Sequence, residues 1–154
     1  MASARVVSPA DPDVHALLEE YFSMRTDSFP GGGYTTTFPD PAAFVAPAGV
    51  FLAIDEDGVA VGCGGVRRIP DGEAGIRYEV KNVFVSPTGR GRGWGRLLLD
   101  ALEDEARRLG ATELVLDTHH SLTAAAGLYD SSGFVTIPPY NDNPNATRWY
   151  GKRL

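Results

Sequence analysis

The sequence contains very little cysteine, with Cys63 as the single example among 154 residues. One thiol cannot close an internal disulfide, and no cluster of Cys or His with metal-ligand spacing accompanies it. Cys63 stands in a run of small and apolar residues (61–65), which predicts a buried side chain rather than a nucleophile. We therefore expect neither a metal site nor thiol chemistry.

Long apolar runs and an excess of basic charge are also missing. No run approaches the ~18 residues of a membrane span, and the first residues lack the charged and apolar segments of a signal peptide. Lysine and arginine number 14 against 20 aspartate and glutamate residues, so the formal net charge is −6. Nucleic-acid binding needs a basic face. These absences predict a cytoplasmic protein that binds neither a membrane nor nucleic acid.

Length and periodicity predict a single domain over residues 1–154, because a chain of this size leaves little room for two cores. Apolar spacing, caps and turn residues predict helices at 11–24, 94–109 and 123–132, and strands at 6–7, 50–54, 59–69, 76–85, 114–117, 134–137 and 148–152. This order, with an antiparallel meander before alternating helices and strands, is typical of a mixed α/β or α+β domain.

A long segment rich in Pro, Gly and Thr (26–47) separates the first helix from the meander. One helical turn is expected near residues 42–45. Loops of this length inside a compact domain are often functional or mobile. The segment is either a substrate lid or a disordered connection, and the sequence leaves both interpretations open.

The clearest chemical signal is the segment 83–96, where a strand leads into a loop with glycines at 89, 91, 93 and 95 and a helix follows. Glycine lets the backbone approach a ligand closely, and a helix start offers free N–H groups and partial positive charge to an anion. Arg90, Arg92 and Arg96 add charge in an acidic chain. The combination predicts a phosphate-bearing ligand, with a purely structural turn as the alternative.

Two other kinds of phosphate loop fit this segment poorly. A Walker-type loop requires Lys followed by Ser or Thr after the last glycine, whereas Arg96 and Leu97 follow Gly95. A dinucleotide-binding loop follows the first strand of a parallel unit. This loop follows an antiparallel meander, and Pro87 interrupts the end of the strand.

Arg90, Gly93 and Gly95 follow the pattern Arg/Gln-x-x-Gly-x-Gly/Ala, with Arg92 in a commonly basic position, and here the chain resembles the GCN5-related N-acetyltransferase (GNAT) superfamily. The likeness also covers the preceding strand (78–85) and the Leu-Tyr and Gly-Phe pairs within 128–134. Residues 76–134 would then form the cofactor-binding core. The resemblance implies the acyl-CoA N-acyltransferase fold, whose mostly antiparallel central sheet is flanked by helices and splayed between strands four and five.

The same resemblance implies an enzyme that moves the acetyl group of acetyl-CoA to a primary amine by direct attack in a ternary complex. The acceptor would be a small molecule, an amino acid or a peptide. The alternatives are an acyltransferase for a longer acyl-CoA and a regulatory module that binds coenzyme A without turnover. A homodimer is left open.

Cofactor contacts are implied as well. The pantetheine arm would pair with the backbone of Val83 and Val85, the Val83 N–H would polarise the thioester carbonyl, and the pyrophosphate would lie on backbone N–H groups of residues 90–95. Ser121 and Thr123 stand where many relatives have an asparagine that contacts the cofactor, which weakens the expectation there. The predicted set is Val83, Phe84, Val85, Arg90, Gly91, Arg92, Gly93, Trp94, Gly95, Arg96, Ser121 and Thr123.

Glu79 and Tyr129 are the predicted catalytic residues. Glu79 is the candidate general base, acting through water. It shares strand parity with Val83 and Val85 unless the strand bulges, as it often does in this family. The alternative is a surface or ion-paired glutamate. Tyr129 is the candidate acid for the departing thiolate, or else a tyrosine packed between helix and sheet.

Other residues are candidates for the acceptor cleft. His119 and His120 follow the fifth strand and offer a wall or an alternative base, although a loop histidine without a role is commoner. Tyr140, Trp149 and Tyr150 offer further walls, but Trp149 and Tyr150 are expected in the core or at a dimer contact. None of these residues identifies the acceptor.

Overall fold

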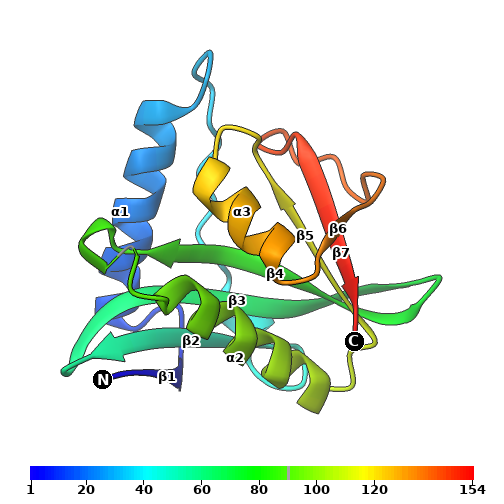
Figure 1. Cartoon of the computed structure of the whole chain (residues 1–154), viewed down its shortest axis with the longest axis horizontal. Helices are drawn as coiled ribbons and strands as arrows, with labels where there is room; N and C mark the ends of the chain where they lie inside the picture. The colour runs from blue at the N-terminus through cyan, green and yellow to red at the C-terminus, as the bar shows by residue number, and fades with distance from the viewer. Residues whose placement is uncertain (90) are drawn as a thin grey trace.

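A seven-stranded sheet with helices on both faces forms the protein (Figure 1), and its strand order is β1-β2-β3-β4-β5-β7-β6. The computed structural model describes residues 1–89 and 91–154. The strands are β1 (Ala2–Val7), β2 (Gly49–Glu56), β3 (Val59–Gly72), β4 (Gly75–Val85), β5 (Glu113–Thr118), β6 (Val135–Thr136) and β7 (Arg148–Arg153). Neighbouring strands are antiparallel except β4 and β5, which are parallel. The predicted mixed, mostly antiparallel sheet is confirmed.

The helices are α1 (Pro12–Ser28), α2 (Trp94–Arg108) and α3 (Thr123–Ser131), with short 3-10 turns η1 (Pro41–Phe44) and η2 (Pro87–Gly89). The start of α1 is where the sequence predicts it. The Asp11 side chain accepts a hydrogen bond from the Asp13 N–H at 3.0 Å, and Pro12 takes the first helical position. α2 ends just before Gly110, whose φ of 94° glycine adopts readily.

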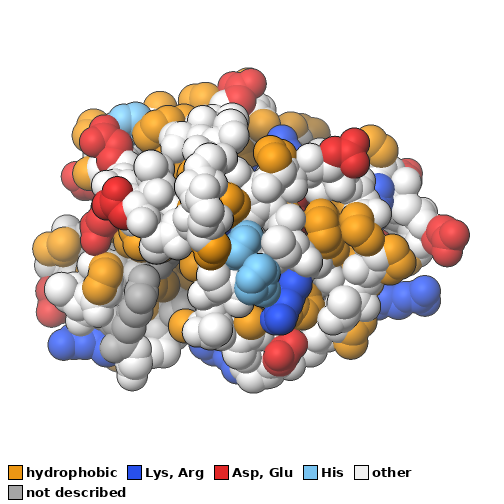
Figure 2. All heavy atoms as spheres, turned by 90° about the horizontal axis from the view of Figure 1, so that it is seen from above, with side chains coloured by type: hydrophobic (Ala, Val, Ile, Leu, Met, Phe, Trp, Pro, Cys, Tyr) orange, Lys and Arg blue, Asp and Glu red, His pale blue; other side chains and the backbone are white. Residues whose placement is uncertain are grey.

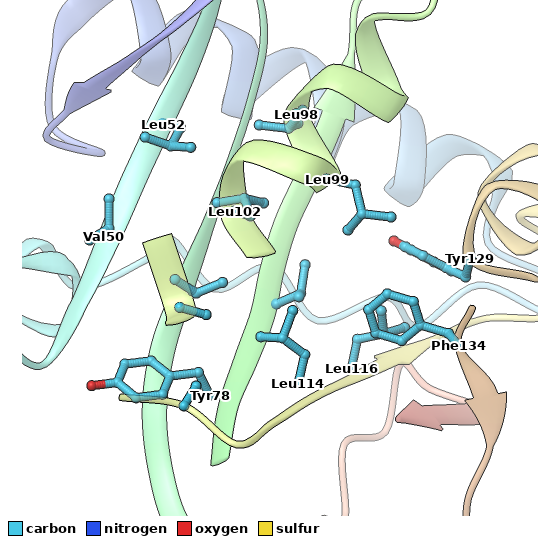
Figure 3. Close-up of a cluster of buried hydrophobic side chains, with 14 of the residues drawn as sticks. Val50, Leu52, Tyr78, Leu98, Leu99, Leu102, Leu114, Leu116, Tyr129 and Phe134 are labelled. Carbon is cyan, nitrogen blue, oxygen red and sulfur yellow. The ribbon is translucent and has the colours of Figure 1, made fainter. Parts of the chain in front are cut away.

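Two apolar clusters hold these layers together. The larger one lies between the sheet and the α2–α3 side, and Figure 3 shows Leu98, Leu99 and Leu102 of α2 within it. In the same view Tyr129 and Phe134 lie beside Leu116 of β5. The smaller cluster packs α1 against the other face of the sheet, through Val14, Leu17, Leu18, Phe22, Phe51, Cys63 and Phe84 among others. The sheet therefore separates α1 from α2 and α3.

The first helix and the third strand are longer than predicted. α1 continues to Ser28 because Phe22 and Arg25 extend its buried face. β3 continues to Gly72, beyond its predicted end at residue 69. Pro70 is tolerated because the β3–β4 register is irregular at this point and no ladder N–H is required.

β4 contains a bulge at Asn82, which has a φ of 58°. The register with β3 shifts there, so that two residues of β4 face one residue of β3. The extra residue reverses the alternation of side chains. Val83 and Val85 pack against the cluster on the α2 side, and Glu79 lies on the opposite face. The shared parity of Glu79 with Val83 and Val85, expected for a strand without a bulge, is therefore wrong.

β4 and β5 separate after a short parallel contact. Pairing with β5 involves Arg77, Tyr78 and Glu79 of β4. In the part of the chain that the structure describes, the β4 edge beyond Glu79 has no strand opposite it on this side. Figure 1 shows β5 and β7 steeply inclined to β1–β4. The predicted splay between the fourth and fifth strands is confirmed.

Candidate active-site cleft

A cleft of about 400 Å³ lies where β4 and β5 diverge. Tyr21 and Arg25 of α1 line it from one face of the sheet, and Leu122 and Tyr129 at α3 line it from the other. Residues 81–83 of β4 and 117–119 at the end of β5 complete its walls. Because α1 and α3 cover opposite faces, the cleft passes through the sheet, and two ligands can meet in it from opposite sides.

The glycine-rich loop opens α2 with main-chain donors that remain available. Gly93 is the N-cap with a φ of 79°, and Gly91 has a φ of 84°. Within the described part of the chain, no side chain caps this helix start, so the N–H groups of its first turn can bind an anion. A Cβ added to Gly95 would lie 3.2 Å from the Leu128 side chain. The predicted contact at Arg90 lies outside the described residues.

The other arginines of the loop have different surroundings. The Arg92 guanidinium lies 5.5 Å from the ring centre of Trp94, which is itself buried. Arg96 donates to the Ser131 Oγ at 2.6 Å and so connects α2 to the end of α3. Phe84 is buried on the α1 side, which leaves its main chain as the group that can meet a cofactor. The cofactor contacts of these residues remain predictions.

Tyr129 lies in the cleft wall that α3 provides, at the edge of the larger core cluster (Figure 3). Its ring centre is 5.8 Å from that of Phe134 and 5.9 Å from that of Tyr150. Burial, and then the charge of Asp117, raises the pKa of the Tyr129 hydroxyl well above its ordinary value. The hydroxyl is therefore protonated at neutral pH and can donate a hydrogen bond in the cleft, although the raised pKa makes it a weaker acid than a solvated tyrosine.

Glu79 is buried behind the cleft wall, with 1% of its surface exposed. Its Oε1 accepts a hydrogen bond from the Arg67 Nε at 2.9 Å, and its Oε2 accepts one from the Tyr140 hydroxyl at 2.7 Å. Asn141 reaches the same Oε2 at 3.5 Å, and both Arg67 and Asn141 line the cleft. The carboxylate is thus held in one orientation, one layer of side chains away from the cleft.

Asp117, at the end of β5, organises a polar network that the sequence did not predict. The Lys81 Nζ lies 3.6 Å from its Oδ1, while the amide groups of Asn141 and Asn143 donate to it at 2.6 and 3.1 Å. Asn141 in turn accepts from the Trp149 Nε1 at 2.9 Å. The network fixes the loop before β7 across the separated ends of β4 and β5. A signal was present in the sequence, because asparagine alternates at 141, 143 and 145.

The loop after α1 forms another wall, where Tyr34, Thr35 and Thr37 line the cleft. Asn145 fastens it from across the cleft. Its Oδ1 accepts from the Thr35 N–H at 3.0 Å, and its Nδ2 donates to the Thr35 carbonyl at 2.8 Å. The predicted helical turn within this segment is present as η1. The loop therefore belongs to the site.

Arg25 brings a charge onto the buried face of α1. Arg25 is 3% exposed. Its guanidinium carbon lies 4.8 Å from the ring centre of Tyr34 and 5.4 Å from that of Phe29. No sequence motif marks Arg25 as a functional residue. The available signal was its spacing, since Arg25 follows Tyr21 and Leu18 on the helix face that was expected to be apolar.

His119 also lines the cleft and is 5% exposed. Its Nδ1 is 2.7 Å from the Ser121 Oγ, and its ring stacks on that of His120 at 4.3 Å. Figure 2 shows a histidine pair side by side on the face seen from above. Burial, followed by the charges of His120 and Arg25, lowers the pKa of His119. The imidazole is therefore neutral at pH 7 and can accept a proton.

Several expectations concern residues that lie elsewhere. Tyr150 is buried in the larger core cluster, as expected. Cys63 is fully buried on the α1 side, and burial raises the pKa of its thiol to about 12.

Among residues 1–89 and 91–154, no three His, Cys, Asp or Glu side chains are arranged to hold a metal ion. No helix in that part of the chain is long and apolar enough to span a membrane.

Comparison with known proteins gives a consistent result. The model of the acetyltransferase (GNAT) family matches residues 14–134. IAA acetyltransferase of Azospirillum brasilense is 35% identical over 133 residues, which cover 86% of this chain and 84% of that protein. A solved Klebsiella pneumoniae structure described as an acyl-CoA N-acyltransferase has a TM-score of 0.77 and 27% identity, covering 100% of this chain and 98% of its own. The yncA structure from Salmonella typhimurium, which contains acetyl-CoA, has a TM-score of 0.70 and 22% identity, covering 100% and 94%.

Proposed function

The chain belongs to the acetyltransferase (GNAT) family and is an acetyl-CoA-dependent N-acetyltransferase, and we propose that it acetylates a primary amine of a small molecule, amino acid or peptide by direct attack in a ternary complex. The observation that carries this proposal is the cleft between β4 and β5, which is lined from both faces of the sheet. The α2–α3 face would receive acetyl-CoA, and the α1 face would receive the amine.

Main-chain groups would bind the cosubstrate. The first-turn N–H groups of α2, preceded by Gly91 and Gly93, would bind the pyrophosphate. The β4 edge beyond Glu79 would pair with the amides of the pantetheine arm, as an added strand does. The Val83 N–H would then polarise the thioester carbonyl as it becomes tetrahedral.

Proton transfer would use one residue from each side of the cleft. The amine nitrogen would attack the thioester carbon to give a tetrahedral intermediate, and the carbon–sulfur bond would break as this intermediate collapses to the amide. A proton leaves the amine through water to Glu79, whose carboxylate is oriented by Arg67 and Tyr140. Tyr129 donates its proton to the departing thiolate and regains one from solvent.

His119 is a second candidate for the base, favoured by its place in the cleft wall and by its neutral imidazole. Glu79→Gln and His119→Gln separate the two. Removal of the true base should lower kcat/KM about 100-fold and abolish the acidic limb of the pH–rate profile. Glu73→Gln, at an exposed position near the β3–β4 turn, is the control and should leave the profile unchanged. An unchanged profile in Glu79→Gln would remove Glu79 from this role.

A panel of amines assayed with acetyl-CoA tests the whole proposal, with free thiol as the signal and the product confirmed by mass. We expect thiol release that depends on the acceptor and initial-rate lines that intersect, as a ternary complex requires. Binding of coenzyme A without release for any amine would indicate a regulatory module. Faster release from longer acyl-CoA thioesters would indicate another acyl specificity. No detectable binding of coenzyme A in calorimetry would overturn the assignment.

A further inference from the structure

The acceptor side of the cleft holds a buried positive charge that has no carboxylate beside it among the residues that the structure describes. Arg25 is 3% exposed and lines the cleft. Its Nε and Nη1 are buried and have no hydrogen-bond partner within the described residues. Burying an ion costs free energy unless it is paired, and the cost is large for a guanidinium deprived of water. Within the described residues, Arg25 is therefore a buried cation whose charge the protein leaves uncompensated.

The other cations of the cleft differ from Arg25 in this respect. The Arg67 guanidinium is 2.9 Å from the Glu79 carboxylate, and the Lys81 Nζ is 3.6 Å from that of Asp117. No ion pair among residues 1–89 and 91–154 includes Arg25. Each of the other two cations has a carboxylate of the protein beside it, so Arg25 alone among these three has an unfilled anion position.

The surroundings of Arg25 strengthen its attraction for an anion. The rings of Tyr34 and Phe29 lie against the guanidinium, and the Phe29 ring centre is 4.9 Å from that of His119. These rings exclude water, and a charge acts over a longer range where the local dielectric constant is low. Arg25 stands on α1, across the sheet from the glycine-rich loop. The anion that it would bind is therefore separate from the pyrophosphate.

We infer that the acceptor is an amine that also carries a carboxylate, as an amino acid does, and that Arg25 binds this carboxylate while the amine points toward the opening between β4 and β5. The inference rests on the proposed function, because it names the acceptor class of the same cleft. A carboxylate has one negative charge, which balances the charge of Arg25, and its two oxygens suit the planar guanidinium. A phosphate dianion would leave a second charge without a partner.

The experiment compares amino acids with their own amides as acceptors, with kcat/KM expressed per free-base amine. Wild-type protein should prefer the carboxylate form about tenfold to hundredfold, the range expected for a hydrogen-bonded charge. Arg25→Met, which keeps much of the side-chain volume, should abolish that preference, and Arg25→Lys should keep part of it. Calorimetric affinity for coenzyme A should be the same in all three proteins. A wild-type enzyme without the preference, or a preference that survives in Arg25→Met, would overturn the inference.

A binding measurement keeps this test independent of turnover. Propionate, inorganic phosphate and sulfate are titrated into wild-type and Arg25→Met proteins saturated with coenzyme A. We expect propionate to bind wild type and to lose at least about tenfold in affinity in Arg25→Met, which should be no less heat-stable because it lacks the unpaired buried charge. Tighter binding of phosphate than of propionate would refute the carboxylate assignment. Propionate binding without acetylation of any amine would contradict the proposed function and leave the anion site standing.

Discussion

The cofactor side and the acceptor side of the cleft are built in different ways. On the cofactor side the proposed contacts are main-chain groups, at the N-terminus of α2 and along the edge of β4. On the acceptor side the cleft is lined by side chains from distant segments, including Arg25 of α1, Asp117 of β5 and Asn141 before β7. The first side needs a local backbone conformation, whereas the second needs the whole fold.

This contrast predicts how substitutions should divide. Changes in backbone conformation at the α2 loop should weaken coenzyme A binding and leave acceptor recognition intact. Changes in side chains on the α1 side should alter acceptor KM and leave coenzyme A affinity intact. A variant that changes both the affinity for coenzyme A and the acceptor KM would show that the two sides are coupled through the sheet.

The largest effect is expected where the two sides meet, at Tyr129. Tyr129→Phe removes the hydroxyl that we propose as the proton donor, and kcat should fall about 100-fold with little change in coenzyme A affinity. The matched control is Tyr150→Phe, which removes a hydroxyl from a buried ring 5.9 Å away. Steady-state kinetics should show near-normal kcat for the control. Equal losses in the two variants would point to packing rather than proton transfer.

A conformational change on the cofactor side should come next in size. Gly93→Ala forces a side chain into a backbone with a φ of 79° although open space surrounds the position, so strain of roughly 1–2 kcal/mol is the whole effect. We expect the dissociation constant of coenzyme A to rise about tenfold, measured by calorimetry. Gly31→Ala has the same φ of 79° and the same open space, but it lies in the loop after α1. If Gly31→Ala also lowered the affinity for coenzyme A, the cofactor side and the acceptor side would not be independent.

The acceptor side should also give the protein a pH-dependent stability. Because the pKa of folded His119 lies below its ordinary value of 6.5, the unfolded chain binds more protons than the folded one below that pH. The free energy of unfolding should therefore be level above pH 6.5 and fall as pH decreases through the folded pKa. The slope from this one group is at most about 1.4 kcal/mol per pH unit.

Denaturant titrations across this pH range check the prediction. His119→Gln should flatten the slope, whereas His15→Gln, at an exposed position on α1, should retain it. The same slope in wild type and His119→Gln would assign the effect to other groups.

The smallest effect is expected at the contact that fastens the loop over the cleft. Asn145→Ala removes both hydrogen bonds to Thr35, at a cost of about 1 kcal/mol each or less because the site is partly solvated. Acceptor KM should rise a few-fold and coenzyme A affinity should not change. Asp142→Ala, an exposed neighbour in the same loop, is the control. An unchanged acceptor KM in Asn145→Ala would mean that the loop is held by its other contacts.

The same contrast explains how much the sequence could predict. The order of strands and helices and the glycine loop follow from local patterns, because glycine spacing and helix starts are properties of contiguous residues. The splayed sheet was expected only from the resemblance to the GNAT superfamily. Asp117 and Asn141 become neighbours only through the pairing of β5 with β7. The burial of Arg25 depends on rings from the following loop. No pattern in a single segment contains that information.

The bulge in β4 could be predicted from the sequence only in part. Asparagine tolerates positive φ better than most residues, so Asn82 was compatible with a bulge, but the residue type alone does not require one. Its presence decided the face on which Glu79 lies. The sequence could thus offer Glu79 as a candidate base, whereas the face of the sheet on which it lies required the strand register.

That one irregular residue also sets a limit on how this chain can vary. An in-frame deletion of Asn82 would remove only one of the residues that line the cleft, yet it would put the two halves of β4 out of phase. Either the Glu79 carboxylate would then point to the α2 side of the sheet, or the Val83 and Val85 side chains would point to the α1 side. Lineages of this protein should therefore accept many substitutions at position 82 more readily than a change in length there, because a length change alters the phase of the whole strand at once.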